Sequence, residues 1–163
     1  PALAGAIFTE ETLVALASLD CAAAIKEASF DAVTFVRTAE ILRKSGARAT
    51  LLTCNDNFIY ESFLLGAAGA LIGFGTIAVS EQIEMHRAAM SGRVREGMEI
   101  WERIRPLEEA IFAVPVRDYR ARMKAALAEV GAISCCAMRP PLFEVSETEK
   151  EIIRAELRKL KMI

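Results

Sequence analysis

Lys26 ends a short apolar run, and it is the side chain of this sequence best suited to covalent chemistry. The residues of Ala22 to Ile25 are all small or apolar and lead directly into it. In a parallel α/β fold, active sites lie at the carboxyl ends of the strands. Apolar surroundings disfavour the ammonium form of a lysine, so its free amine becomes available to attack a ketone. Spacing alone also allows a lysine that simply reaches water along its aliphatic stem.

The other chemically active residue types form no recognisable constellation. None of the four cysteines is spaced as in a CxxC motif (Cys21, Cys54, Cys135 and Cys136). The sequence has a single histidine, His86, so a zinc site that needs a second histidine is not expected. This pattern favours reduced thiols in a cytoplasmic protein, with no metal. Asn55 and Asp56 follow an apolar run, where such residues commonly cap the next helix. Glu27 is adjacent to Lys26 in a strand, so the two side chains point to opposite faces.

Three short apolar runs predict buried strands, and each lies between helical patterns: Cys21–Lys26, Ala49–Thr53 and Ala70–Phe74. The helices expected around them are Thr9–Ser18, a helix from Ser29 or Asp31 to Gly46, Asn57–Leu65 and Ser80–Gly92. Alternation of this kind predicts parallel strands joined by right-handed crossovers.

After Gly92 the pattern becomes entirely helical. Long helices are expected at Arg93–Ala113, with a kink or break at Pro106, and at Tyr119–Val130. A capping box at Ser146 opens a last helix to about Lys159. We therefore divide the chain into an α/β part, residues 1–92, and a helical part, residues 93–163. Three parallel strands are too few to close a barrel and would leave edges and apolar faces uncovered.

Composition excludes several other classes of protein. The chain has 163 residues, 53% hydrophobic and 26% charged, which is typical of a globular domain. A net charge of −2 argues against a nucleic-acid partner. The 19 residues from Ser62 to Ser80 carry no charge, close to the ~20 that span a bilayer, but a helix end, a turn and a buried strand explain them equally well. We expect no membrane association.

Several segments in order resemble the dihydrodipicolinate synthase / N-acetylneuraminate lyase family of class I, Schiff-base aldolases. Ile25 to Ser29 resembles its I-K-E-A-S/T segment, and Leu51 to Asp56 its L-L-S-G-D-D strand end. Other segments resemble the family only loosely when each is taken alone, but they follow one another in the family's order and spacing. These segments are residues 1–5 together with 9–13, then 65–70, 123–127 and 139–142. The resemblance covers nearly the whole chain, from the end of the fifth barrel strand onward.

The resemblance implies the second half of a (β/α)8 TIM barrel, with strands 6–8 and their helices, plus a C-terminal three-helix extension. It implies that Lys26 forms an imine with pyruvate or a related 2-keto acid, with no metal or organic cofactor. The backbone carbonyl of Leu71 would then lie beside the bound keto acid, and Cys54 would replace a glycine that lines the pocket. A cytoplasmic homo-oligomer is expected.

Departures from the family pattern narrow these expectations. The family's proton-relay tyrosine would lie three residues before Pro1, and its carboxylate-binding threonine pair earlier still. Leu3 stands where the synthases have an arginine for their second substrate, while Cys54 and Ile72 make the pocket more apolar. A lyase with a different acceptor, either an aldolase or a dehydratase, is therefore favoured over lysine biosynthesis.

Two functional readings follow. The first is an aldolase-type carbon–carbon or carbon–oxygen lyase present as a partial chain, whose missing N-terminal half-barrel or a second chain completes the site. The alternative is a non-catalytic half-barrel that self-associates and retains the lysine from its ancestry.

Overall fold

The computed structural model describes residues 7–163, so the predictions made for Pro1 and Leu3 lie outside the described residues. The described chain forms two compact units. One is an α/β unit that ends at Ile72 and also includes His86–Arg93; the other is a helical unit of Gly73–Met85 and Val94–Ile163. The division of the chain after residue 92 remains a prediction.

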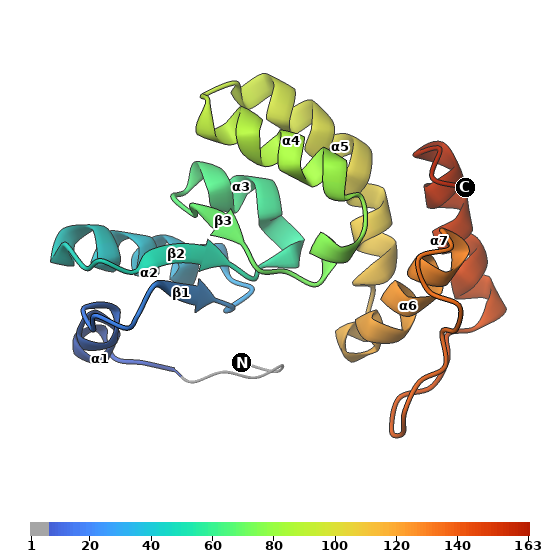
Figure 1. Cartoon of the computed structure of the whole chain (residues 1–163), viewed down its shortest axis with the longest axis horizontal. Helices are drawn as coiled ribbons and strands as arrows, with labels where there is room; N and C mark the ends of the chain where they lie inside the picture. The colour runs from blue at the N-terminus through green and yellow to red at the C-terminus, as the bar shows by residue number, and fades with distance from the viewer. Residues whose placement is uncertain (1–6) are drawn as a thin grey trace. The chain divides into compact units, whose positions relative to one another are not determined.

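The α/β unit has a parallel sheet of three strands in the order β1-β2-β3 (Figure 1). Its elements are α1 (Glu10–Ala17), β1 (Ala24–Glu27), α2 (Ala32–Ser45), β2 (Thr50–Thr53), the 3-10 helix η1 (Asp56–Phe58), α3 (Ile59–Leu64) and β3 (Gly69–Ala70). Lys26 pairs with Leu52, and Leu52 pairs with Gly69. The predicted alternation and the parallel direction are confirmed. The third strand is shorter than predicted: it spans Gly69–Ala70, and Phe74, its predicted last residue, lies in a 3-10 helix, η2 (Phe74–Thr76).

Local hydrogen bonds fix the helix ends in this unit. The Thr9 side chain accepts from the backbone N–H of Thr12 at the start of α1, and Asp31 accepts from Thr34 at the start of α2. The same Thr34 hydrogen bonds hold the pKa of Asp31 below its usual range. Gly46 ends α2 in the left-handed conformation, with φ of 67°.

The two faces of the sheet differ in burial. On one face Glu27, Leu51 and Thr53 are buried, and Leu51 lines a cavity together with Val36 and Leu42 of α2. On the other face Ala24, Lys26 and Thr50 are exposed, and Leu52 is only half-buried. Since side chains alternate along a strand, the described residues cover one face of this sheet and leave the face of Lys26 open.

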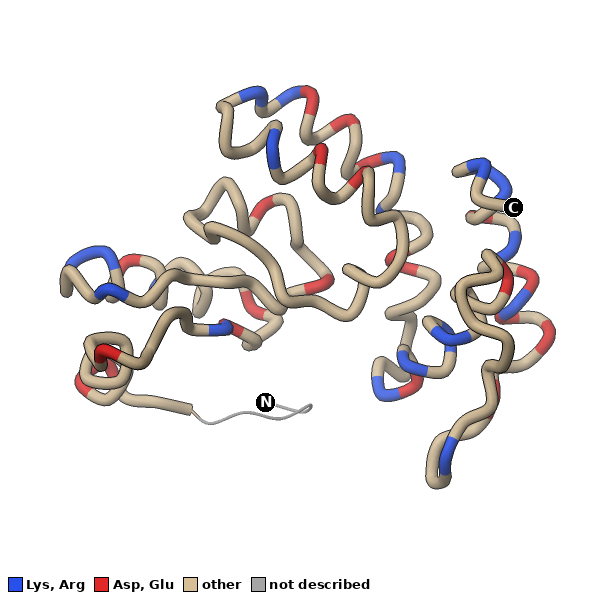
Figure 2. The backbone as a smooth tube through the Cα atoms, in the orientation of Figure 1, with Lys and Arg blue, Asp and Glu red and all other residues tan. Residues whose placement is uncertain are grey.

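The helical unit begins after Ile72 and contains α5, the longest helix of the described residues. Its elements are η2, the first part of α4 (Val79–Met90), α5 (Val94–Ile111), the 3-10 helix η3 (Val116–Asp118), α6 (Tyr119–Glu129) and α7 (Glu147–Lys159). Acidic and basic segments alternate along α4, α5 and α7 (Figure 2). None of the helices within residues 7–163 combines the length and the apolar character needed to cross a membrane.

Helix α5 continues through Pro106, so of the predicted kink or break the break is wrong, and the kink remains a prediction. A proline inside a helix removes one hydrogen bond and costs about 3 kcal/mol. Here Trp101, Ile104 and Leu107 flank the proline and are at most 1% exposed. Packing of this apolar stripe offsets the lost hydrogen bond, so the helix is not interrupted at Pro106.

A buried arginine joins α5, α6 and α7 of this unit. Arg122 of α6 is 3% exposed and donates to Glu149 of α7 at 2.9 Å and to the carbonyl of Ala113, just after α5, at 2.6 Å. Glu149 also completes the predicted capping box with Ser146. One carboxylate therefore both caps α7 and neutralises the buried guanidinium.

This ion pair makes stability depend on pH. The hydrogen bond from Arg122, followed by those from Ser146, lowers the pKa of Glu149 below its ordinary value of 4.5. A carboxyl with a lowered pKa in the folded state stabilises above its unfolded pKa, and this contribution disappears as the pH falls through the folded value. Glu149 is 35% exposed, so we expect the contribution to be about 1 kcal/mol.

The Glu149→Gln variant is expected to unfold more easily than the parent at pH 7 and to approach it below pH ~4. Urea unfolding at both pH values measures the difference. Glu147→Gln is the matched control, because Glu147 is 73% exposed. An equal loss of stability at both pH values for Glu149→Gln would contradict the role of its charge.

Candidate active site

The three predicted site residues lie at the carboxyl ends of three adjacent strands. Lys26 is the third residue of the four-residue strand β1. Cys54 directly follows β2, and its backbone N–H donates to the carbonyl of Glu27 at 2.7 Å. Leu71 directly follows β3, and its N–H donates to the carbonyl of Thr53 at 2.9 Å. The parallel register thus brings an amine, a thiol and an apolar side chain to one edge of the sheet.

These side chains are more accessible than the sequence suggested. Lys26 is exposed, Cys54 is half-buried and Leu71 is 57% exposed. The sequence predicted apolar, low-dielectric surroundings for Lys26. Within residues 7–163 the lysine instead lies on the open face of the sheet, so further protein would have to cover that face to desolvate the amine.

A buried polar network supports the backbone on either side of this edge. Glu27 is 8% exposed and Asn55 fully buried, and the Asn55 amide donates to the Glu27 carboxylate at 2.7 Å. The same amide nitrogen lies 3.1 Å from the hydroxyl of Thr53. These contacts tie the end of β1 to the end of β2. As predicted, Glu27 turns away from the face that carries Lys26.

The network also holds the loop that follows Lys26. The other oxygen of the Glu27 carboxylate accepts from the N–H of Ser29 at 3.0 Å. The amide oxygen of Asn55 accepts from the N–H of Phe30 at 2.7 Å. Phe30 has a φ of 58°, a left-handed conformation that is unfavourable for a non-glycine residue. Hydrogen bonding to Asn55 helps to keep this conformation and therefore the path of the chain after Lys26.

Comparison with known proteins agrees with this arrangement of strands. A model of the dihydrodipicolinate synthetase family matches residues 1–160. The chain belongs to this family. It is similar to 4-hydroxy-tetrahydrodipicolinate synthase 2 of Clostridium acetobutylicum, with 26% identity over 93% of this chain and 51% of the relative. The synthase of Methanopyrus kandleri is 31% identical over 85% of this chain and 44% of its own length.

Solved structures of the family share the fold. The dihydrodipicolinate synthase of Thermotoga maritima superposes with a TM-score of 0.84 at 25% identity, covering 94% of this chain and 51% of that one. The chain therefore spans about half the length of the family members it matches. The exact strand numbering and the three-helix extension remain predictions.

The sequence missed the buried network of Glu27, Thr53 and Asn55. It assigned Asn55 to helix capping, but Asn55 makes no side-chain cap and binds the β1 end instead. One signal was present: strand alternation puts Glu27 on the face opposite Lys26, where the aligned Thr53 also points. A carboxylate on a buried face requires hydrogen-bond donors.

His86 has a packing role in the α/β unit. Its imidazole lies edge-on to the ring of Phe63, with centroids 4.9 Å apart, and its Nε2 is 3.0 Å from the carbonyl oxygen of Ala68. Both contacts connect α4 to the segment that leads into β3. His86 therefore helps to pack α4 against the residues that precede β3.

Proposed function

We propose that this chain supplies strands 6–8 and the C-terminal helices of a class I aldolase-type barrel, and that Lys26 is its Schiff-base lysine. The observation that carries the proposal is the position of Lys26 beside Cys54 and Leu71, at the carboxyl edge of a parallel sheet in a member of the dihydrodipicolinate synthetase family. In the family that this chain resembles, a lysine at this position forms an imine with pyruvate. We extend this chemistry to pyruvate or a related 2-keto acid as the substrate.

The chemistry follows from the amine. The neutral Nζ of Lys26 adds to the ketone carbon, and the resulting carbinolamine loses water to give an imine. The protonated imine withdraws electrons from the neighbouring carbon, which can then lose a proton to give an enamine. The enamine attacks an aldehyde carbon in the condensation direction, and the same steps in reverse cleave that bond. In the dehydratase alternative, the hydroxyl group on the carbon next to the nucleophilic enamine carbon takes up a proton and leaves as water.

The proposal also assigns roles to Leu71 and Cys54 and to residues outside this chain. The carbonyl of Leu71 lies beside the keto acid, and Cys54 lines the pocket. By the resemblance, the proton-relay tyrosine and the carboxylate-binding threonine pair belong to another segment. The open face of the sheet is where the remaining half-barrel, or a second chain, would pack and exclude water from Lys26.

Reductive trapping tests the proposal on the whole protein. Incubation with pyruvate and borohydride is expected to add a reduced pyruvyl group to the peptide that contains Lys26, as measured by mass spectrometry. Protein treated with borohydride alone is the control. An adduct on another lysine, or no adduct in a folded whole protein, would rule out the imine role of Lys26.

A non-catalytic, self-associating half-barrel is the second candidate, and the uncovered sheet face supports it. Ala24, Lys26 and Thr50 are exposed on that face, and two copies could cover each other there. Light scattering on this 163-residue chain tests this alternative. A stable dimer that never forms a pyruvate adduct favours it, whereas a monomer argues against it. The homo-oligomeric state and the cytoplasmic location of the enzyme remain predictions.

A further inference from the structure

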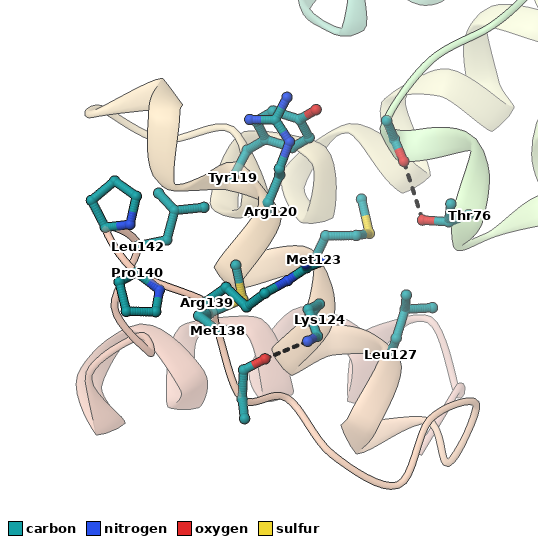
Figure 3. A pocket seen from close by; sticks show the side chains of 13 residues that line it. Thr76, Tyr119, Arg120, Met123, Lys124, Leu127, Met138, Arg139, Pro140 and Leu142 are labelled. Carbon is teal, nitrogen blue, oxygen red and sulfur yellow. Dashed lines mark hydrogen bonds between the residues drawn. The ribbon is translucent and has the colours of Figure 1, made fainter.

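The helical unit contains a pocket formed entirely by its own residues. The pocket has a volume of about 760 Å³ and lies between α6, the segment 137–142 and the residues around Gly73 (Figure 3). Pockets for small organic molecules typically have volumes of about 300–1,000 Å³. Since Lys26 belongs to the other unit, this pocket can be tested separately from the proposed lyase chemistry.

The charge of the lining has one sign. Arg120 and Lys124 of α6 and Arg139 of the following loop contribute to it, and no aspartate or glutamate does. Arg139 is the only basic residue of the loop between α6 and α7. The chain as a whole carries a net charge of −2, so this cluster is a local feature and not a reflection of composition.

Two of the cations are held in place by their own contacts. The Lys124 ammonium donates to the carbonyl of Ala137, which ties α6 to the loop. The guanidinium of Arg120 lies 4.8 Å from the centroid of the Tyr119 ring. Arg139 is exposed, and its side chain makes no hydrogen bond or ion pair within residues 7–163. Arg139 therefore has donors available, while Arg120 and Lys124 provide a fixed positive field.

The aromatic part of the wall is also rigid. Tyr119 stacks on Phe112 with centroids 4.8 Å apart and an interplanar angle of 14°. Both rings press against Gly73, where a Cβ atom would lie 2.9 Å from Tyr119 Cε2 and 3.0 Å from Phe112 Cζ. The remaining wall is largely apolar, with Met123, Leu127 and Leu142 among its residues. A fixed wall lowers the entropy cost of binding a ligand.

We propose that this pocket binds a small carboxylic acid with an apolar or aromatic body. A guanidinium with free donors matches a carboxylate in a bidentate arrangement. The apolar wall would cover the body of the ligand, and it disfavours a doubly charged phosphate because burying each charge costs solvation energy. The site is independent of the imine chemistry at Lys26.

Binding of 1-naphthoate to the whole protein tests the proposal by calorimetry. We expect 1-naphthoate to bind at least about tenfold more tightly than the neutral 1-naphthamide, which corresponds to about 1.4 kcal/mol. Arg139→Gln is expected to weaken naphthoate binding about tenfold. Arg117→Gln is the matched control, because Arg117 is exposed and pairs with Asp118 outside the pocket lining.

The outcomes separate this proposal from its rivals. No naphthoate binding by the folded whole protein, as would occur if another segment fills the pocket, overturns it. Equal binding of acid and amide overturns the anion selectivity, and displacement by inorganic phosphate at lower concentration than naphthoate overturns the preference for a carboxylate. Lys26→Arg is expected to bind naphthoate like the parent. A loss in that variant would place the ligand at the lyase site and contradict the proposal.

Discussion

Replacement of Lys26 by arginine is expected to abolish the capture of pyruvate by borohydride and to lower turnover on the order of 10⁴-fold or more. Arginine keeps a positive charge and a long aliphatic stem at the end of β1, but its guanidinium does not deprotonate in proteins. The variant therefore separates nucleophilicity from charge. Mass spectrometry of the trapped protein and a steady-state assay with a 2-keto acid measure the two effects.

The control for this prediction is Lys44→Arg. Lys44 is an exposed residue of the last turn of α2, where its Nζ lies 3.5 Å from Oε2 of Glu40. The same change of side chain there is expected to leave trapping and turnover unchanged. Pyruvate capture that survives in Lys26→Arg at the parental level would contradict the assignment, whatever the activity of the protein.

The features that the sequence predicted well depend on interactions between near neighbours. Thr9 begins its helix where predicted, Asp31 is one of the two predicted starts of the next helix, and Ser146 forms the predicted capping box with Glu149. In each case the hydrogen bond joins residues three positions apart, so the short pattern contains all the partners. Gly46 is similar, because its left-handed conformation is a property of a single residue.

The features that the sequence did not predict depend on distant partners. Strand β3 ends at Ala70 because its pairing partner β2 ends at Thr53, and an apolar run cannot reveal where its neighbour stops. Helix α5 continues through Pro106 because its buried stripe packs inside the helical unit. Both outcomes are set by tertiary contacts that override local preference.

The residues of the candidate site were predicted from the sequence, but the hydrogen bonds that support them were not. Strand periodicity and the family resemblance together led to Lys26, and the resemblance alone led to Cys54 and Leu71. The register of the strands puts all three at one edge of the sheet. The hydrogen bond between Glu27 and Asn55 joins residues 28 positions apart. No short-range sequence pattern could specify that pair, although the hydrogen bond supports the backbone beside the lysine.

The Asn55→Asp variant is expected to lose about 3 kcal/mol of the free energy of unfolding. The change conserves shape and leaves an oxygen to accept from the N–H of Phe30. It replaces the amide that donates to Glu27 at 2.7 Å with a second carboxylate in a buried position. Two carboxylates at that distance cannot both be ionised, so one must take up a proton or the ends of β1 and β2 must separate.

Asn57→Asp tests the same chemical change at an exposed site two residues later. The Asn57 amide donates to the carbonyl of Phe30 at 3.3 Å, so it contacts the same loop without contacting Glu27. We expect this variant to lose less than about 1 kcal/mol in urea unfolding, as for a solvent-exposed hydrogen bond. If the two variants lose equal stability, the buried network does not hold the loop. If Asn55→Asp alone is destabilised and also traps less pyruvate on Lys26, the network supports the position of the nucleophile as well as the fold.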